Sequence, residues 1–233
     1  MMSMTRLPLI SATLFLAACA SPAPVKVHYP SESTVSRPQP APAPAAGAAA
    51  QGPFEPNAYL RACYGIRVSN SPLVDEDGWV INYKPIVVVN GVPLAAAPAN
   101  DVCLTSGFGQ RFGRRHDGID LQSRPASTIY AAAPGRVIEA RVSTGYGNMV
   151  LIDHGNGVYT RYAHLAYIQP GVQKGGEIGF GQPVGFMGSS GNATAIHIHY
   201  EILTGNYNNP RGSKGLSPRD PFTFPPYEYA QAY

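Results

Sequence analysis

The spacing of glycine in the middle of the chain limits its fold more than any other feature. Residues 105–203 hold most of the 25 glycines, placed at short intervals between small apolar runs. Glycine is a poor helix former and supplies the positive φ that tight turns need. The intervening runs, such as Met149–Ile152, Val158–Tyr162 and Val184–Met187, have the length of short strands. This pattern predicts a mainly β domain, a sandwich or barrel of antiparallel strands.

The composition of the 233-residue chain excludes several classes of protein. Charged residues make up 13% and 23 residues are proline, which argues against a coiled coil or a helical bundle. The net charge of +3 comes from 17 basic and 14 acidic residues that are scattered along the chain, so we expect no nucleic-acid partner. Every apolar run is shorter than the roughly 18 residues of a transmembrane helix.

The N-terminus has the features of an export signal. Arg6 precedes an uncharged apolar stretch, residues 7–18, that is too short to span a bilayer. This stretch ends in Leu-Ala-Ala-Cys, which resembles the bacterial lipoprotein signal, in which Cys19 becomes the acylated first residue. We therefore expect a signal peptide over residues 1–18 and a membrane anchor on Cys19. The alternative is an ordinary signal that is cleaved near residues 17–20.

A spacer follows the predicted anchor. Ala20 stands after Cys19, and the enterobacterial sorting rule would then place the lipoprotein in the outer membrane, facing the periplasm. Between Pro38 and Ala50 almost every residue is proline or alanine, a composition that cannot bury a core. Residues 19–56 are therefore predicted to be a disordered tether.

Export also bears on the two remaining cysteines. With Cys19 acylated, Cys63 and Cys103 form an even pair in an oxidising compartment, and we expect a disulfide between them. A reactive or metal-binding thiol is the alternative, although neither cysteine lies in a Cys-x-x-Cys motif or beside a histidine.

Residues 57–104 are predicted to form a small β subdomain. Trp79–Tyr83 is strand-like, and Ile86–Val89 is followed by Asn90-Gly91, the pair that favours a type I′ hairpin turn. The segment is too short for a core of its own, so we expect it to pack on the domain that follows. It could simply extend the sheet, or it could line or cover an active-site groove.

Four histidines fall into three short motifs inside the glycine-rich region. The motifs are His116-Asp117-Gly118-Ile119-Asp120, Tyr162-Ala163-His164-Leu165 and His197-Ile198-His199. In a strand over 196–202, the four apolar side chains, Ile196 among them, would face a core, and His197, His199 and Glu201 would face the other way. His116 and Asp120 would share a face of an extended segment, with Gly118 leaving room between them. His28 is expected to be solvated.

Two histidines and one aspartate are suitable ligands for Zn²⁺. Three protein ligands leave a fourth position for water, as in catalytic sites, whereas structural sites are closed by four. The metal lowers the pKa of its water to about 7 and polarises a carbonyl oxygen. His164 and one histidine of the pair His197/His199 are then free for proton transfer or for stabilising an oxyanion.

Together, in this order, the motifs resemble the LytM or lysostaphin-like family of zinc endopeptidases, which cut bacterial cell-wall peptides. The resemblance covers roughly half of the chain, to about Asp220-Pro221. The segments that carry it are Ser106–Arg111, His116–Asp120, Ala131–Val137, Gly145–Asn148, His154–Gly157, Tyr162–Leu165, Gly181–Gly185, Gly188–Thr194 and His197–Glu201.

The resemblance implies a role for each key residue. It implies that His116, Asp120 and His199 bind one Zn²⁺ per chain, and that His164 and His197 assist water activation and stabilise the tetrahedral intermediate. It also implies a two-layer, mostly antiparallel β fold over 105–224, followed by a C-terminal tail over 225–233. His154 matches a turn position and is expected to be structural.

Two departures from the family pattern leave these five residues in place. Asn192–Ile196 replaces the usual Thr-Gly-Pro run, which could reshape a wall of the groove, and the stretch from Arg111 to His116 is short. Some LytM-type proteins have lost ligands and instead activate cell-wall amidases, which is the main alternative function. A structural zinc site would need Glu201 as a fourth ligand, and its position two residues from His199 in a strand makes that strained.

The predicted function is hydrolysis of peptide cross-links in peptidoglycan, during cell-wall remodelling or division. The partners implied are the stem peptides of the wall, the membrane through Cys19, and proteins of the wall or division apparatus. In a diderm bacterium the expected bond joins D-Ala to the diamino acid of a neighbouring stem peptide. In a Gram-positive bacterium it could lie in a glycine bridge.

Overall fold

The structure, a computed structural model, describes residues 52–65, 70 and 74–228. These residues all belong to one compact unit. The predicted signal peptide, the acylated Cys19 and nearly all of the tether lie outside the described residues. Within the described part, no helix has the length and apolarity needed to cross a membrane.

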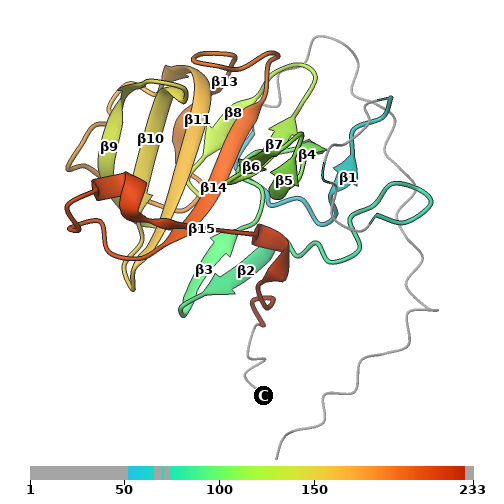
Figure 1. The fold of residues 1–233 in the computed structure, drawn as a ribbon, viewed down its shortest axis with the longest axis horizontal. Coiled ribbons are helices and arrows are strands. Elements are labelled where there is room, and N and C mark those ends of the chain that lie inside the picture. The colour runs from blue at the N-terminus through green and yellow to red at the C-terminus, as the bar shows by residue number, and fades with distance from the viewer. Residues whose placement is uncertain (1–51, 66–69, 71–73, 229–233) are drawn as a thin grey trace, which may run out of the picture. The chain divides into compact units, whose positions relative to one another are not determined.

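The described chain is mainly β, as the glycine pattern predicts (Figure 1). Its two short 3-10 helices are η2 (Gly212–Gly215) and η3 (Pro221–Thr223). The strands are β1 (Arg61–Ala62), β2 (Ile86–Val89), β3 (Val92–Ala95), β4 (Cys103–Ser106), β5 (Gly109–Arg111), β6 (Arg114–His116), β7 (Ile119–Gln122), β8 (Thr128–Tyr130), β9 (Gly135–Ser143), β10 (Gly147–Asp153), β11 (Val158–Ile168), β12 (Glu177–Ile178), β13 (Pro183–Met187), β14 (Ile198–Thr204) and β15 (Ser217–Arg219).

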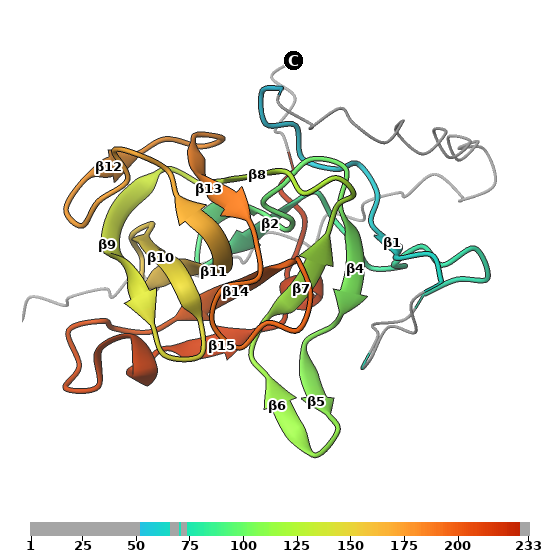
Figure 2. The same cartoon turned by 90° about the horizontal axis from the view of Figure 1, so that it is seen from above.

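Eleven strands form one large sheet. Its main path runs β1-β4-β7-β14-β11-β10-β9-β12, with β15 added beside β14, and β13 and β8 attached through β11. All pairs are antiparallel except β1 with β4. The hairpins β2–β3 and β5–β6 form separate two-stranded sheets. Figure 2 shows the β5–β6 hairpin projecting away from the large sheet.

Strand β11 gives the sheet its second layer by changing partners along its length. As far as Ala163 it pairs with β14, and from Leu165 onward it pairs with β13. His164, between the two segments, has a φ of 61°, in the left-handed region that residues other than glycine seldom adopt. The sheet therefore bends at His164, and β13 and β8 curve away from the β9–β10–β14 layer (Figures 1 and 2).

The two faces of the central strands differ in character. Ile198, Tyr200 and Ile202 of β14 belong to the main hydrophobic core, together with Ile119 and Leu121 of β7. The opposite face holds His199 and Glu201, and then a smaller apolar cluster that includes Leu203. The predicted alternation is thus confirmed for His199 and Glu201. It is wrong for Ile196, which is 48% exposed because β14 begins only at Ile198.

The segment 57–104 shares the main core. Leu60, Val87 and Leu94 pack in the same cluster as the strands of the large sheet, and β1 extends that sheet beside β4. The predicted hairpin is confirmed, since β2 and β3 flank Asn90 and Gly91, both of which have positive φ. The strand predicted over Trp79–Tyr83 is wrong: Trp79 and Val80 form only isolated bridges and a turn follows.

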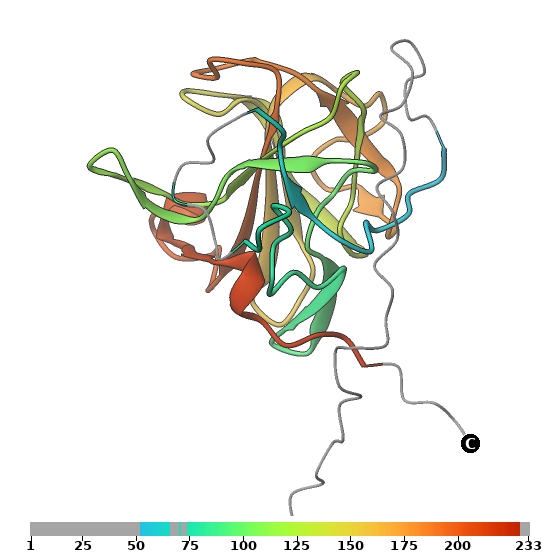
Figure 3. The same ribbon diagram turned by 90° about the vertical axis from the view of Figure 1, so that its right-hand side faces the viewer.

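A disulfide and two backbone hydrogen bonds fix the N-terminal and C-terminal parts of the described chain. The structure has a disulfide between Cys63 and Cys103, next to the β1–β4 pair. At the other end, the amide of Val88 donates to the carbonyl of Pro225, and the amide of Tyr227 donates to that of Ile86. The C-terminal segment after η3 therefore lies beside the β2–β3 hairpin (Figure 3).

Truncation of Leu121 should destabilise this fold strongly. Leu121 is fully buried between β4 and β14, so we expect Leu121→Ala to lower the free energy of unfolding by about 2–5 kcal/mol. Val142→Ala on β9, where the side chain is 74% exposed, should change it by less than about 0.5 kcal/mol. Urea titration of both variants checks this. Equal losses would contradict the assignment of the core to the Leu121 face.

Candidate metal centre

Strand register brings the predicted site residues together. Asp120 of β7 lies directly opposite His199 of β14, which lies opposite Ala163 of β11. Directly opposed residues project from the same face, so Asp120 and His199 meet on the face away from the main core. His116 ends β6 and reaches the same point across the turn at Gly118. A Cβ on Gly118 would lie 2.3 Å from the carbonyl oxygen of Tyr200, so only glycine fits there.

Three ligand atoms converge at this point. His116 Nε2 lies 3.1 Å from Asp120 Oδ1 and 3.0 Å from His199 Nδ1, and His199 Nδ1 lies 2.9 Å from Asp120 Oδ1. All three residues are buried. Among the described residues they are the group of histidine, cysteine and carboxylate side chains whose geometry could hold a metal ion. This is the set that the family resemblance implies as ligands, whereas the motifs alone left the choice between His197 and His199 open.

Hydrogen bonds on the outer side of each imidazole fix which nitrogen faces the group. His116 Nδ1 donates to the carbonyl oxygen of Gly107 at 2.6 Å, and His199 Nε2 donates to Glu201 Oε1 at 2.9 Å. In the neutral rings, the nitrogens that face Asp120 therefore carry lone pairs. Lone pairs that face one another repel, so a proton or a metal cation has to lie between them.

The close contacts between these side chains shift the pKa values of His199 and Asp120 in opposite directions. Burial opposes the charged form of His199, but hydrogen bonds to Asp120 and Glu201 outweigh it and raise the pKa of His199 to about 9. Burial would likewise raise the pKa of Asp120, but the hydrogen bonds with His116 and His199 outweigh burial and lower it. The metal-free group thus holds a proton that a cation would displace.

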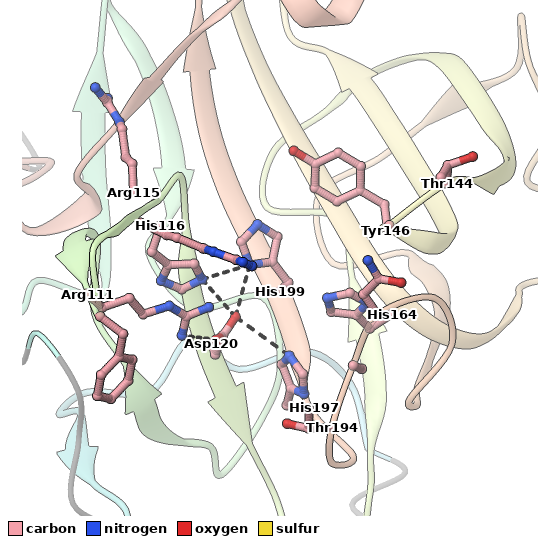
Figure 4. Close-up of a pocket in the computed structure, with 15 residues that line it drawn as sticks. Arg111, Arg115, His116, Asp120, Thr144, Tyr146, His164, Thr194, His197 and His199 are labelled. Carbon is pink, nitrogen blue, oxygen red and sulfur yellow. Dashed lines mark hydrogen bonds and ion pairs between the residues drawn. The ribbon is translucent and has the colours of Figure 1, made fainter.

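His164 and His197 lie beside the group, on the side away from His116 (Figure 4). Their ring centroids are 4.9 Å apart, and that of His164 is 5.9 Å from that of His199. His164 Nδ1 donates to the carbonyl of Ser190 and His197 Nδ1 to that of Ala195, both at 2.8 Å. Burial lowers the pKa of His164 to about 4, so this ring is neutral at pH 7 and its Nε2 can accept a proton.

The five residues lie in a groove of about 740 Å³. Arg111 and Arg115 of the β5–β6 hairpin lie on one side of the group, and Tyr146 lies on the other (Figure 4). Phe112 and Asn192 also line the groove. Asn192–Thr194, part of the run that replaces Thr-Gly-Pro, therefore lines the groove, as expected. No described residue from 57–104 lines the groove. His154 lies outside the groove lining and donates to the carbonyl of Pro134.

Three residues support the site residues through contacts away from the metal position. We assigned no role to Arg111 or Tyr146 from the sequence and considered Glu201 only as a strained fourth ligand. Arg111 Nη1 contacts Asp120 Oδ2 at 3.0 Å, which leaves Oδ1 for the metal position. Glu201, fully buried, also accepts from Tyr146 at 2.8 Å and pairs with Arg161 at 2.5 Å. Glu201 thus contacts the far nitrogen of His199 and is not directed at the metal position. Arg111, Tyr146 and Glu201 all stand inside the recognised motifs, which was the available signal.

Comparisons with known proteins agree with this geometry. Residues 114–210 match the model of peptidase family M23. A stretch of 149 residues is 34% identical to DD-carboxypeptidase/endopeptidase Mpg of Neisseria meningitidis and covers 58% of this chain and 31% of that protein. A stretch of 88 residues is 38% identical to peptidoglycan DD-endopeptidase ShyA of Vibrio cholerae and covers 38% of this chain and 20% of that protein.

A solved structure is also similar. The catalytic domain of the prophage-encoded M23 protein EnpA from Enterococcus faecalis is 31% identical, with a TM-score of 0.47, over 55% of this chain and 95% of that one. The chain spans less than a third of the length of the two curated relatives. The match to the family model and the identity to Mpg assign residues 114–210 to a peptidase domain. That domain belongs to peptidase family M23.

Zinc affinity should depend on pH through His199. Below its raised pKa of about 9 the ring is protonated, so zinc has to displace a proton. We expect the apparent zinc affinity to fall by about tenfold per pH unit between pH 8 and 6, with about one proton released per zinc. Calorimetry in buffers of different ionisation enthalpy measures both quantities. A pH-independent affinity would contradict the hydrogen-bond assignment at His199.

Glu201 should affect both stability and metal affinity. Glu201→Gln leaves the buried Arg161 guanidinium without its counter-charge, so we expect a loss of about 3 kcal/mol in unfolding free energy. The double variant Glu201→Gln/Arg161→Met should recover part of that loss, yet bind zinc about 10–100-fold more weakly than the wild type. Urea titration and competition with a zinc chelator separate the two effects. Wild-type affinity in the double variant would show that the negative charge of Glu201 does not strengthen His199 as a ligand.

Proposed function

We propose that the chain is a zinc-dependent endopeptidase that hydrolyses peptide cross-links of peptidoglycan. The observation that carries this proposal is the convergence of three lone-pair-bearing atoms on one buried point beside two further histidines. The M23 domain and the names of the similar proteins, which include a peptidoglycan DD-endopeptidase, support the substrate class.

The donor set fits zinc. Tetrahedral Zn²⁺ with bonds of about 2.0–2.1 Å to N and O atoms holds its ligand atoms roughly 3.3 Å apart. The three donor atoms lie 2.9–3.1 Å from one another, so small side-chain shifts suffice. Both imidazoles present lone pairs, and a single oxygen of Asp120 completes the set. His116, Asp120 and His199 would therefore hold one Zn²⁺ and leave a position open towards the groove.

His164 and His197 would transfer protons during hydrolysis and stabilise the oxyanion. When bound, zinc lowers the pKa of a water molecule and polarises the scissile carbonyl. His164 and His197 each use Nδ1 to donate to a backbone carbonyl, which leaves Nε2 to take the proton of the attacking water and return one to the leaving amine. In its protonated form, either ring can also donate to the oxyanion. The groove orients an extended peptide across these groups.

The alternative functions lack comparable support. An amidase activator that has lost its ligands would not need five intact site residues. A structural zinc site would need a fourth protein ligand, but Glu201 is engaged with His199 Nε2, Tyr146 and Arg161. The open position next to His164 and His197 suits catalysis.

The location and organisation of the chain remain part of the proposal. We propose a lipoprotein of the cell envelope, acylated on Cys19 after removal of residues 1–18 and held in the outer membrane on a tether over 19–56. Residues 57–104 would then be the small β subdomain and 105–224 the peptidase domain. The support is the Leu-Ala-Ala-Cys motif and the Pro/Ala-rich sequence.

The test is cleavage of dimeric muropeptides by the full chain, purified in detergent. We expect dimers to be converted to monomers, with a chelator abolishing the activity and Zn²⁺ restoring it, and with His116→Ala lowering it by at least about 10³-fold. His28→Ala, in the predicted tether, is the matched control and should retain full activity. Mass spectrometry of the products identifies the bond. Intact dimers in the presence of one bound zinc per chain would contradict the proposal.

A further inference from the structure

A second cavity, of about 660 Å³, lies on the same face of the sheet as the metal centre. We call it the basic pocket; its defining side chains are Arg115, Arg141, Tyr146, Arg161, Lys214 and Arg219. Residues of η2 and of β15, the strand that pairs with β14, contribute to its lining (Figure 1). Neither the sequence motifs nor the proposed reaction uses it.

The basic pocket continues the catalytic groove. Arg115, Thr144 and Tyr146 line both cavities. The Tyr146 ring lies between them: its centroid is 5.9 Å from that of His199, and the guanidinium carbon of Arg161 is 4.5 Å from it on the pocket side. A peptide that crosses the metal position can therefore extend into the basic pocket past a single aromatic ring.

Three of the five cations are balanced by carboxylates. Arg115 pairs with Asp117 at 2.9 Å, and Arg141 pairs with Glu139 at 2.6 Å. Arg161, almost fully buried, pairs with Glu201, as described above. These pairs fix the base and one wall of the pocket without giving it a net charge.

Lys214 and Arg219 are the surplus cations. Within residues 52–65, 70 and 74–228, neither forms an ion pair, and both side chains are exposed. The Nε of Arg219 donates to Thr204 Oγ1 at 2.9 Å, which holds the guanidinium in place while its terminal nitrogens stay available. The pocket therefore has a net positive charge and a preoriented donor.

Apolar residues complete the pocket. Met149, Leu203 and Leu216 contribute to its lining beneath the charged rim. A methylene chain can contact these side chains while a terminal anion reaches Lys214 and Arg219. The chemistry that matches is an aliphatic side chain ending in a carboxylate.

We propose that the basic pocket binds a free side-chain carboxylate of the cross-linked peptide and so favours peptides with that carboxylate over peptides in which it is a carboxamide. This proposal rests on the proposed peptidase function and names its substrate class. It assigns Lys214 and Arg219 as specificity residues that act on binding, at a distance from the reacting bond.

The test compares two cross-linked dimeric peptides. They differ only at the end of the aliphatic side chain that would enter the basic pocket, which is a carboxylate in one and a carboxamide in the other. For the zinc-loaded full chain we expect kcat/KM to be about five- to tenfold higher for the carboxylate, mainly through KM. Lys214→Ala/Arg219→Ala should bring that ratio to about one, and Lys214→Glu should reverse the preference. Lys174→Ala removes an exposed charge outside both cavities and should leave the ratio unchanged.

A binding measurement separates this proposal from the proposed function. Uncleaved monomeric stem peptides, as carboxylate and as carboxamide, are titrated into the same proteins by calorimetry. One outcome is that the wild type cleaves neither dimer and still binds the carboxylate monomer more tightly than the carboxamide, with this difference in affinity lost in the double variant. In that case the peptidase proposal fails and the pocket assignment stands. Equal binding of the two monomers, or an unchanged preference in the double variant, overturns the pocket assignment.

Discussion

The site depends on the register of three adjacent strands. Asp120, His199 and Ala163 lie opposite one another on β7, β14 and β11, and a slip of one residue in either pairing would turn a ligand towards the core. The core enforces the register, because Leu121, Ile198 and Tyr200 are fully buried on the other face. Apolar burial on one face thus places the polar group on the opposite face. Ala163, a small and fully buried residue, stands opposite His199 on β11.

The glycine pattern predicted the mainly β class and Asn90-Gly91 predicted the hairpin, because both depend on local chemistry. The set of residues that converges was implied by the family resemblance that the histidine motifs carry. Trp79–Tyr83 has strand-like residues, but among the described residues it forms only isolated bridges. Ile196 precedes the point where β14 begins, so strand pairing decides both cases. The contact of Arg161 with Glu201 links segments 40 residues apart, and that of Arg111 with Asp120 depends on how the β5–β6 hairpin folds, so alternation within one strand indicates neither.

His164, where β11 changes its partner strand, also has a strained backbone conformation. His164 adopts a left-handed backbone conformation, which costs a non-glycine residue about 1–3 kcal/mol. The same residue marks the change of partner from β14 to β13, so the bend that creates the second layer also points an imidazole at the metal position. Its amide donates to the carbonyl of Tyr146 and its Nδ1 to that of Ser190. These bonds hold the strained residue in one orientation, which suits a group that has to exchange protons.

Buried charge connects the metal centre to its surroundings. Glu201 contacts His199 on one side and Arg161 on the other, and Tyr146 bonds to both Glu201 and Arg161. A carboxylate buried this deeply needs a cation, and Arg161 supplies it while its guanidinium forms the base of the basic pocket. The Arg161–Glu201 ion pair therefore affects both the orientation of His199 and the charge of the basic pocket. Because of this shared pair, a change that alters charge in the pocket at Arg161 would also disturb the metal centre, whereas Lys214 and Arg219 can vary without that cost.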